Sequence, residues 1–317
     1  MNFSVLASGS AGNASLLEAD GFGVLIDAGL GPRQLATRLT AVGASWQRVR
    51  AVVLTHTHSD HWNDRTFAHL RRQRIPLYCH AGHHAPLASY APAFAGLRAD
   101  GLVRSYAAGE DLTLAPGIRC RPLPLRHDGS VTCGFRFDVG HGLFGGPTAL
   151  AYAADLGCWQ PDLARALADV DILALEFNHD VGMEYASGRS PRLIMRVLGD
   201  EGHLSNVQAA GLLREMVRLS EPGRLRHLVQ LHLSRDCNRP ALAVAAAGEV
   251  LAACTPPVAI HTARQDEPGP CLALGEANGV RRPRPRVRRP RPARPAESPA
   301  FFQPWLPGWE TSDCTET

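Results

Sequence analysis

The run H-T-H-S-D-H at positions 56–61 constrains this chain more than any other feature of its sequence. It follows a short segment rich in β-branched residues, a pattern typical of a buried strand. His56 and His58 are two positions apart, so on an extended chain they face the same side and can reach one ion. Asp60 and His61 follow where the chain turns and can reach a second ion. Because imidazole with carboxylate suits zinc, manganese or iron better than calcium, the run predicts a metal centre rather than solvated histidines.

Length and composition allow an ordinary globular protein. At 317 residues the chain fits one large domain or two smaller ones, and 45% apolar content supports a sizeable core. The first residues carry no basic segment and no long apolar stretch, so we expect no signal peptide. No segment approaches the roughly 20 apolar residues of a spanning helix, so we expect no membrane contact. The eight cysteines are scattered without a C-x-x-C pair, which indicates reduced thiols in a cytoplasmic protein.

The basic charge of the chain comes from arginine and is concentrated near the C-terminus. Residues Arg281–Pro295 are almost wholly arginine and proline and contain no acidic residue. Such a composition cannot bury a core, so we predict a folded domain at 1–274 and a disordered, Arg/Pro-rich tail at 275–317. Two interpretations of the tail remain open: a solvated linker, or a non-specific contact with nucleic-acid phosphates.

The predicted secondary structure alternates short strands with helices, which favours an α/β fold with mixed sheets and helices outside. A lone histidine or aspartate at a strand end is commonly a cap or a satisfied polar group. Sites in layered α/β folds assemble where strand ends converge, so several such residues together indicate one functional centre. Four predicted strands end in a residue of metal-ligand type: His56 with His58, His127, Asp155 and His232.

The order of these residues resembles the metallo-β-lactamase fold hydrolases: Asp27 precedes the run at 56–61, and His127, Asp155 and His232 follow it. This resemblance implies an αββα four-layer sandwich of mixed β-sheets with outer helices. It also implies two divalent metal ions, zinc or manganese, at one edge of the sandwich.

Shorter motifs resemble the YycJ-type (WalJ) branch of that family over residues 1–274. Two features depart from the branch: W-N-D at 62–64 replaces the usual glycine-bearing continuation, and the Arg/Pro tail is not a family feature. The branch motifs in this chain are L-A-S-G-S-A-G-N at 6–13, L-I-D-A-G at 25–29, N-H-D at 178–180, G-H-L-S-N at 202–206 and H-L-S at 232–234.

The resemblance also implies a role for each matched residue. A hydroxide would bridge the two ions, and Asp60 would orient it. Asp27 would orient the ligands from the layer around them; the alternative that it only forms the turn at its strand end stays open. His179 and Asp180 match the branch as well, so they are assigned to the residues that surround the metal ligands, without a specific role. The implied ligands are His56, His58 and His127 for one ion, Asp60, His61 and His232 for the other, and Asp155 between the two.

His203 is the accessory residue with the most defined predicted role. Ser205 and Gln208 have the spacing of a capping box, so a helix should begin there. A helix N-terminus favours anions, and a histidine beside it can contact a phosphate or protonate a leaving oxygen. The order of Glu176, His203 and His232 also resembles the tRNA 3′-processing ribonucleases of this superfamily, in which a comparable histidine serves phosphodiester cleavage.

The predicted function is a binuclear metal-dependent hydrolase, specifically a phosphodiesterase acting on nucleic acid, with Asp60 and His203 as catalytic residues. The YycJ-type resemblance implies DNA exonuclease activity. A thioesterase or lactonase on the same metals stays an alternative, because a fold does not determine its reaction. A non-catalytic, zinc-binding protein associated with nucleic acid is a third interpretation. His80, His83 and His84 have no carboxylate companion nearby, so they are left outside the predicted site.

Overall fold

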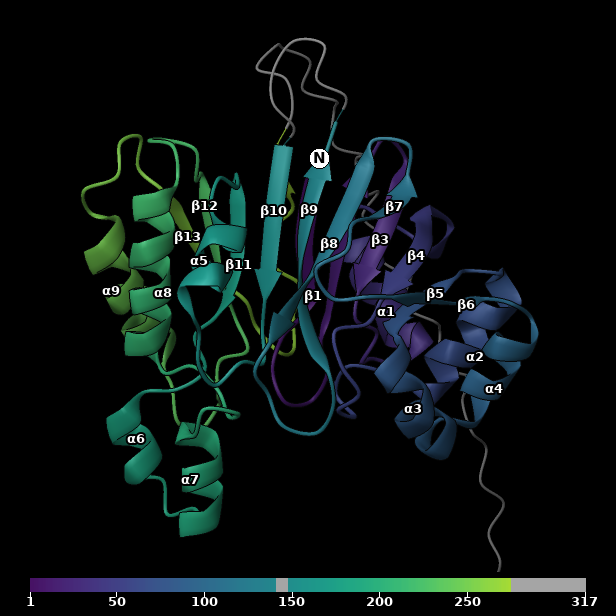
Figure 1. The fold of residues 1–317 in the computed structure, drawn as a ribbon, viewed down its shortest axis with the longest axis horizontal. Helices are drawn as coiled ribbons and strands as arrows, with labels where there is room; N and C mark the ends of the chain where they lie inside the picture. Colours follow the sequence, from purple (N-terminus) through teal and green to yellow (C-terminus); the bar gives the residue numbers. More distant parts are fainter. Residues whose placement is uncertain (141–147, 275–317) are drawn as a thin grey trace, which may run out of the picture. The chain divides into compact units, whose positions relative to one another are not determined.

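The computed structural model of the protein describes residues 1–140 and 148–274, which form two mixed β-sheets packed face to face (Figure 1). The first sheet has the strand order β14-β1-β2-β3-β4-β5-β6. Its first half is antiparallel, and β3 to β6 run parallel. The strands are β1 (Asn2–Ala7), β2 (Ala14–Ala19), β3 (Phe22–Ile26), β4 (Val49–Val53), β5 (Leu77–His80), β6 (Val103–Tyr106) and β14 (Leu272–Ala273).

The second sheet repeats this plan with the order β13-β12-β11-β10-β9-β8-β7. Strands β7 to β10 pair as antiparallel neighbours, and β10 to β13 run parallel. The strands are β7 (Leu112–Ala115), β8 (Ile118–Leu125), β9 (Thr132–Val139), β10 (Thr148–Ala153), β11 (Ile172–Glu176), β12 (His227–Leu231) and β13 (Ala259–Thr262).

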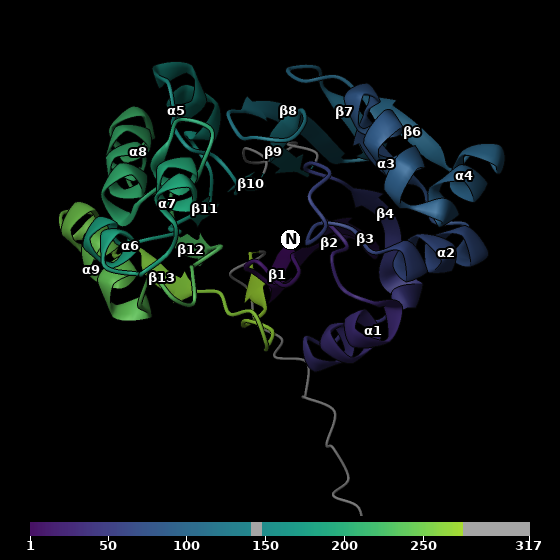
Figure 2. The same ribbon diagram turned by 90° about the horizontal axis from the view of Figure 1, so that it is seen from below.

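Helices cover the outer face of each sheet, as a view along the layers shows (Figure 2). Apolar side chains line the space between each sheet and its helices. The predicted αββα sandwich is therefore confirmed. The first sheet carries α1 (Pro32–Ala41), α2 (Asp64–Gln73), α3 (His84–Tyr90) and α4 (Pro92–Ala99), and the second carries α5 (Pro161–Leu167), α8 (Asn206–Leu219) and α9 (Pro240–Leu251).

Two short helices, α6 (Val181–Tyr185) and α7 (Pro191–Leu198), leave this layered plan. They follow β11 and project beyond the edge of the sheets toward which β10 runs (Figure 1).

No helix within the two described ranges is long and apolar enough to cross a membrane. The tail, including Arg281–Pro295, lies outside the described residues, so its disorder and its contact with nucleic acid stay predictions.

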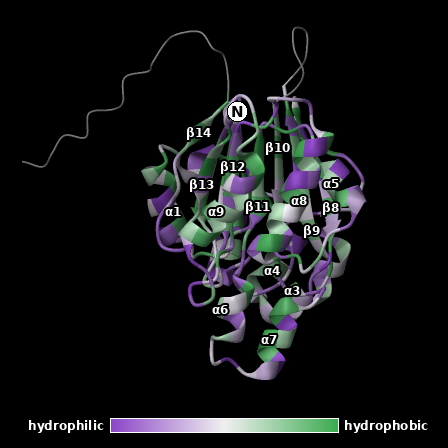
Figure 3. Cartoon of the chain, turned by 90° about the vertical axis from the view of Figure 1, so that its left-hand side faces the viewer, coloured by the Kyte–Doolittle hydropathy of each residue, from purple (hydrophilic) through white to green (hydrophobic). Residues whose placement is uncertain are grey.

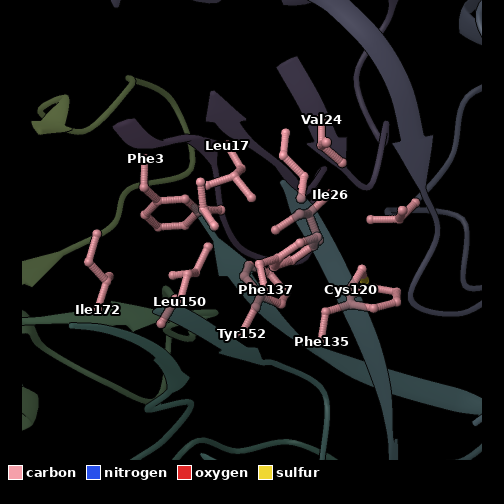
Figure 4. Packing of buried hydrophobic residues seen from close by; sticks show 14 of the residues in the cluster. Phe3, Leu17, Val24, Ile26, Cys120, Phe135, Phe137, Leu150, Tyr152 and Ile172 are labelled. Carbon is pink, nitrogen blue, oxygen red and sulfur yellow. The ribbon is translucent and has the colours of Figure 1, made fainter. Parts of the chain in front are cut away.

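The main core lies between the two sheets (Figure 4). Phe3 and Ile26 from the first sheet belong to one buried cluster with Phe135, Phe137 and Tyr152 from the second, and all five are at most 1% exposed. Each fully buried side chain of this size stabilises the fold by about 1.5–3 kcal/mol. This cluster fixes the two sheets against each other and thereby sets where the ends of their strands meet.

Three of the predicted site residues lie within two residues of a strand end and have an unusual backbone conformation. Asp27, Asp155 and His232 have φ angles of 62°, 62° and 54°, in the left-handed region that side chains other than glycine seldom adopt. Such backbone is stable only when surrounding contacts hold it, and it concentrates at functional sites.

Candidate metal centre

The first group of ligand-type side chains contains His56, His58 and His127, whose ligand nitrogens lie within 4.8 Å of one another. His127 Nδ1 lies 2.9 Å from the carbonyl oxygen of Gly202 and donates to it, which leaves Nε2 as the lone-pair atom, 3.3 Å from His58 Nδ1. Burial lowers the pKa of His56 well below its ordinary value, and burial with the neighbouring His127 lowers that of His58. Both rings are therefore neutral, the form in which histidine binds a metal ion.

The second group contains Asp60, His61 and His232, whose ligand atoms also lie within 4.8 Å of one another. The Nε2 atoms of His61 and His232 lie 3.5 and 3.6 Å from Oδ2 of Asp60. Burial lowers the pKa of His61, but the carboxylates of Asp27, Asp155 and Asp60 outweigh it and raise this pKa well above its ordinary value. A proton on His61 thus balances the negative charge around this ring, a role that a bound cation would take over.

Asp155 is buried and touches both groups. Its Oδ2 lies 3.3 Å from His61 Nε2, and its Oδ1 lies 3.5 Å from His232 Nε2. It also forms a ligand-type group with His56 and His61. Although burial raises the pKa of Asp155, His232 and His61 hold it well below its ordinary value. The carboxylate is therefore ionised and faces both sets of imidazoles.

Three buried atoms of this cluster have no hydrogen-bond partner among the described residues: His56 Nε2, Asp155 Oδ2 and His232 Nε2. Buried polar atoms are rarely left unpaired, because each lost partner costs about 1–3 kcal/mol. Imidazole nitrogen and carboxylate oxygen are the ligand atoms of zinc and manganese sites. The unpaired atoms and the donor set therefore fit divalent cations, which the metallo-β-lactamase fold implies, without specifying the metal.

Asp27 holds His61 from the side away from the cluster. Its Oδ2 accepts a hydrogen bond from His61 Nδ1 at 2.8 Å, and its Oδ1 accepts one from the backbone N–H of Thr55 at 2.8 Å. Burial raises the pKa of Asp27, while His61 and the Thr55 hydrogen bonds oppose that shift. This contact directs His61 Nε2 into the cluster.

Two residues that sequence reasoning did not assign also support the cluster. Asn13 Nδ2 donates to Asp60 Oδ2 at 3.0 Å, and Asn178 Nδ2 donates to the carbonyl oxygen of His232 at 2.8 Å. Both lie inside motifs that were noted only as signs of family resemblance. No local pattern marks either side chain, since their partners are 47 and 54 residues away.

Glu176 joins the cluster to His203. Its Oε1 lies 2.8 Å from His203 Nδ1 and 3.2 Å from His232 Nδ1, so both rings donate to the same oxygen. Its Oε2 accepts from the backbone N–H groups of Leu156 and Leu204. Burial alone would raise the pKa of Glu176, but His203 and His232 lower it to about 2. The structure thus places His203 beside the metal-type residues, between the rings of His127 and His232.

His179 and Asp180 lie outside the four ligand-type groups found among the described residues. The carbonyl oxygen of His179 accepts from the backbone N–H of Asn206 at the start of α8. Asp180 is the N-cap of α6, with Oδ1 accepting from the backbone N–H of Met183 at 2.9 Å. Their assignment to the layer around the ligands stays a prediction.

The departure from the branch at 62–64 has a local structural role. The Asn63 side chain accepts from the backbone N–H of Thr66 and caps α2, and Trp62 Nε1 donates to the carbonyl oxygen of Thr57.

The three histidines left outside the predicted site also lie outside the cluster. His83 Nε2 lies 2.7 Å from the carbonyl oxygen of Val131. His80, His83 and His84 belong to none of the ligand-type groups in the described part of the chain.

Comparison with known proteins places this geometry in a family. Residues 23–225 match the β-lactamase superfamily domain. The chain is 28% identical over 241 residues to exodeoxyribonuclease WalJ of Streptococcus pneumoniae, covering 76% of this chain and 84% of that protein. It is 26% identical over 259 residues to exodeoxyribonuclease YycJ of Bacillus anthracis, covering 79% and 89%.

Among solved structures, the fold is similar to that of Zn²⁺-bound PqqB from Methylobacterium extorquens. The TM-score is 0.61 at 18% identity, over 86% of this chain and 100% of that one. At this identity the likeness supports the fold alone. The domain match covers more than half of the chain, and the ligand-type residues converge at one sheet edge. The chain therefore belongs to the metallo-β-lactamase superfamily of metal-dependent hydrolases and resembles its WalJ/YycJ-type members over most of its length.

Proposed function

We propose that this protein is a binuclear metal-dependent phosphodiesterase that acts on nucleic acid, and more narrowly a DNA exonuclease. The curated relatives named exodeoxyribonuclease support the substrate class, at 26–28% identity. The observation that carries the proposal is the Glu176–His203 pair beside the metal-type cluster, with His203 Nδ1 2.8 Å from Glu176 Oε1. A histidine held in this way can protonate an alkoxide leaving group.

The proposed ligands follow from the two groups described above. A pair of divalent ions at this site would polarise a phosphoryl group and stabilise charge on its attacking and leaving oxygens. The proposed ligands are His56, His58 and His127 for one ion, Asp60, His61 and His232 for the other, and Asp155 for both.

Residues around the ligands prepare the site before substrate arrives. Asp27 fixes the His61 ring, and Asn13 holds the Asp60 carboxylate at its Oδ2. Asp60 is proposed to orient the attacking water through its oxygens. His203 keeps Nδ1 on Glu176 Oε1, so its proton for the leaving oxygen is carried at Nε2.

The test compares reaction classes on one preparation. The protein is stripped with a chelator, reloaded with zinc or manganese, and assayed on end-labelled DNA, bis-p-nitrophenyl phosphate, thioesters and lactones. We expect hydrolysis of both phosphodiesters with at least one metal. His203→Ala should lower kcat on DNA by about 10²- to 10⁴-fold, the usual contribution of general acid catalysis. The effect should be smaller on bis-p-nitrophenyl phosphate, whose leaving group needs no proton.

Two outcomes would contradict the proposal. One is hydrolysis of thioesters or lactones without phosphodiester cleavage under either metal, which would favour carboxyl chemistry on the same site. The other is an equal loss on DNA and on bis-p-nitrophenyl phosphate in His203→Ala, which would remove the proton-donor role of that residue.

A further inference from the structure

Asp128 follows His127 directly in the chain and lies beside two of the proposed ligands. Its Oδ1 lies 3.5 Å from His58 Nε2 and 3.6 Å from His127 Nε2. Within residues 1–140 and 148–274 it is the one carboxylate at ion-pair distance from His58, yet it belongs to none of the four ligand-type groups found there. The function proposed above gives Asp128 no part.

The two ring nitrogens of His58 face different groups. Nδ1 lies 3.3 Å from His127 Nε2, whereas Nε2 lies 3.5 Å from Asp128 Oδ1. Two tetrahedral ligands of one zinc ion, each about 2.0–2.1 Å from it, are about 3.3 Å apart. His58 Nδ1 and His127 Nε2 therefore have the separation of neighbouring ligand atoms. It follows that Nδ1 is the atom of His58 that would bind metal and that Nε2 is left to carry the proton of the ring.

The position of that one proton decides whether the neutral His58 ring can bind metal here. With the proton on Nδ1, His58 would donate to the lone pair of His127 Nε2 across the 3.3 Å gap, and neither nitrogen would be free for an ion. With the proton on Nε2, His58 faces the Asp128 carboxylate, which can only accept. Asp128 therefore favours the form of the ring that is ready for metal.

The Asp128 carboxylate is itself held in place by α7 and the turn after it. Arg196 of α7 donates to both carboxylate oxygens: Nη2 lies 2.9 Å from Oδ1, and Nε donates to Oδ2. The backbone N–H of Asp128 donates to the carbonyl oxygen of Glu201 at 2.9 Å. Figure 3 shows α7 below the sheets, where it carries hydrophilic as well as hydrophobic residues. Because paired hydrogen bonds from an arginine fix the plane of a carboxylate, α7 sets the direction in which Asp128 faces.

The backbone after Asp128 closes against the same edge of the His58 ring. Gly129 has a φ of 95°, and a Cβ atom at this position would stand 2.5 Å from His58 Nε2. Ser130 then contacts Thr57, with 2.9 Å between their hydroxyl oxygens. These contacts hold His58 Nε2 on the side of the ring where Asp128 lies.

We propose that Asp128 is a positioning residue: held by Arg196, it keeps the proton of His58 on Nε2 and thereby leaves Nδ1 free for the ion that His58 shares with His56 and His127. The inference rests on the metal site of the function proposed above and adds the group that prepares one of its ligands. Partners that hold a ligand in this way typically change metal affinity by about 10- to 100-fold.

The first measurement reads the position of the proton in the metal-free, full-length protein. Long-range ¹H–¹⁵N NMR spectra distinguish the two neutral forms of each histidine ring. We expect His58 to carry its proton on Nε2 in the wild type and to shift toward Nδ1 in Asp128→Ala. His127 should keep its proton on Nδ1 in both proteins, because that nitrogen donates to the carbonyl oxygen of Gly202.

The second measurement is the zinc affinity, obtained by competition with a chromophoric chelator. Asp128→Ala should weaken one of the two zinc-binding steps about 10- to 100-fold. Arg196→Gln should weaken it less, because the carboxylate remains but is released from α7. Asp111→Ala is the matched control: Asp111 makes the same paired contact with Arg121, at 2.6 and 3.0 Å, and has no ion pair with a histidine within the described ranges.

Three outcomes would overturn the inference. One is an unchanged His58 proton position together with wild-type zinc affinity in Asp128→Ala. Another is a fall in affinity with the His58 proton still on Nε2, which would favour Asp128 as a direct ligand. The third is an equal fall in Asp111→Ala, which would show a general effect of charge. Should Asp128→Ala fail to fold, the same readouts on Arg196→Gln decide, and wild-type results there would overturn the inference.

Neither measurement depends on the reaction that the site catalyses. A wild-type protein that binds zinc but cleaves no phosphodiester would refute the proposed function, while the NMR spectra and zinc affinities would still report on Asp128.

Discussion

Gly29→Ala should damage the candidate metal centre without touching any proposed ligand. Gly29 follows β3 in the turn after Asp27, and its backbone lies against the backbone of Asp60. A Cβ atom at Gly29 would stand 1.8 Å from the carbonyl oxygen of Asp60 and 2.8 Å from the backbone nitrogen of Asn13. Both neighbours are backbone atoms of segments that hold the cluster, so neither can rotate away.

The size of the effect follows from that contact. Real Cβ atoms essentially never approach another heavy atom closer than 3.0 Å, so the Asp60 backbone must move by more than 1 Å. Asp60 and its neighbour His61 would move with it. Overpacking of this kind costs about 1–3 kcal/mol of stability. A 1 Å misplacement of catalytic groups can lower activity by about 10²-fold.

Gly31→Ala provides a control two residues along the same turn. A Cβ at Gly31 meets only the Gln34 side-chain oxygen at 3.6 Å, an ordinary contact, and its φ of −63° suits alanine. We expect this variant to keep the wild-type metal content, measured by mass spectrometry, and the wild-type kcat on bis-p-nitrophenyl phosphate. Gly29→Ala should lose both metal and about 10²-fold in kcat while its circular dichroism stays native. Native metal content and activity in Gly29→Ala would refute the close approach on which the reasoning depends.

Two further predictions concern buried carboxylates of the cluster. Asp155→Asn should reduce the bound metal measured by mass spectrometry, because the two groups of histidines lose the anion between them; undiminished metal would argue against Asp155 as a shared ligand. Glu176→Gln should destabilise the metal-free protein by about 2–6 kcal/mol in urea unfolding. Each carboxylate oxygen of Glu176 accepts from two donors, whereas the single amide oxygen of glutamine can accept from only two of those four. The pKa of Glu176 falls from 4.5 to about 2 on folding, so its contribution is present above pH 4.5 and lost as the pH falls toward 2. Glu176→Gln should flatten that part of the stability–pH curve, and an unchanged curve would contradict the assigned contacts.

Local patterns explain why much of the centre was predictable. The H-x-H-x-D-H run begins three residues after the end of β4, and Asp155 and His232 follow β10 and β12, as the strand and turn signals predicted. The capping box at Ser205 also appears as predicted, with Gln208 reaching back to the Ser205 backbone. These features depend on neighbouring residues, whose spacing along the chain fixes their geometry.

Other parts of the centre depend on residues far apart in the chain. Glu176 shares one oxygen between His203 and His232, which lie 27 and 56 residues later, and Arg196 reaches Asp128 across 68 residues. The three short helices α3, α4 and α6 were not placed by the sequence analysis either.

The sequence alone determined the fold class and the family, and it predicted the residues that would bind metal, because ligand chemistry and strand periodicity are local properties of the chain. Only the tertiary structure decided which carboxylate holds which histidine, how closely the turn at Gly29 approaches Asp60, and where α6 and α7 lie relative to the centre. Those facts follow from the packing of the two sheets, which brings the ends of distant strands to one edge.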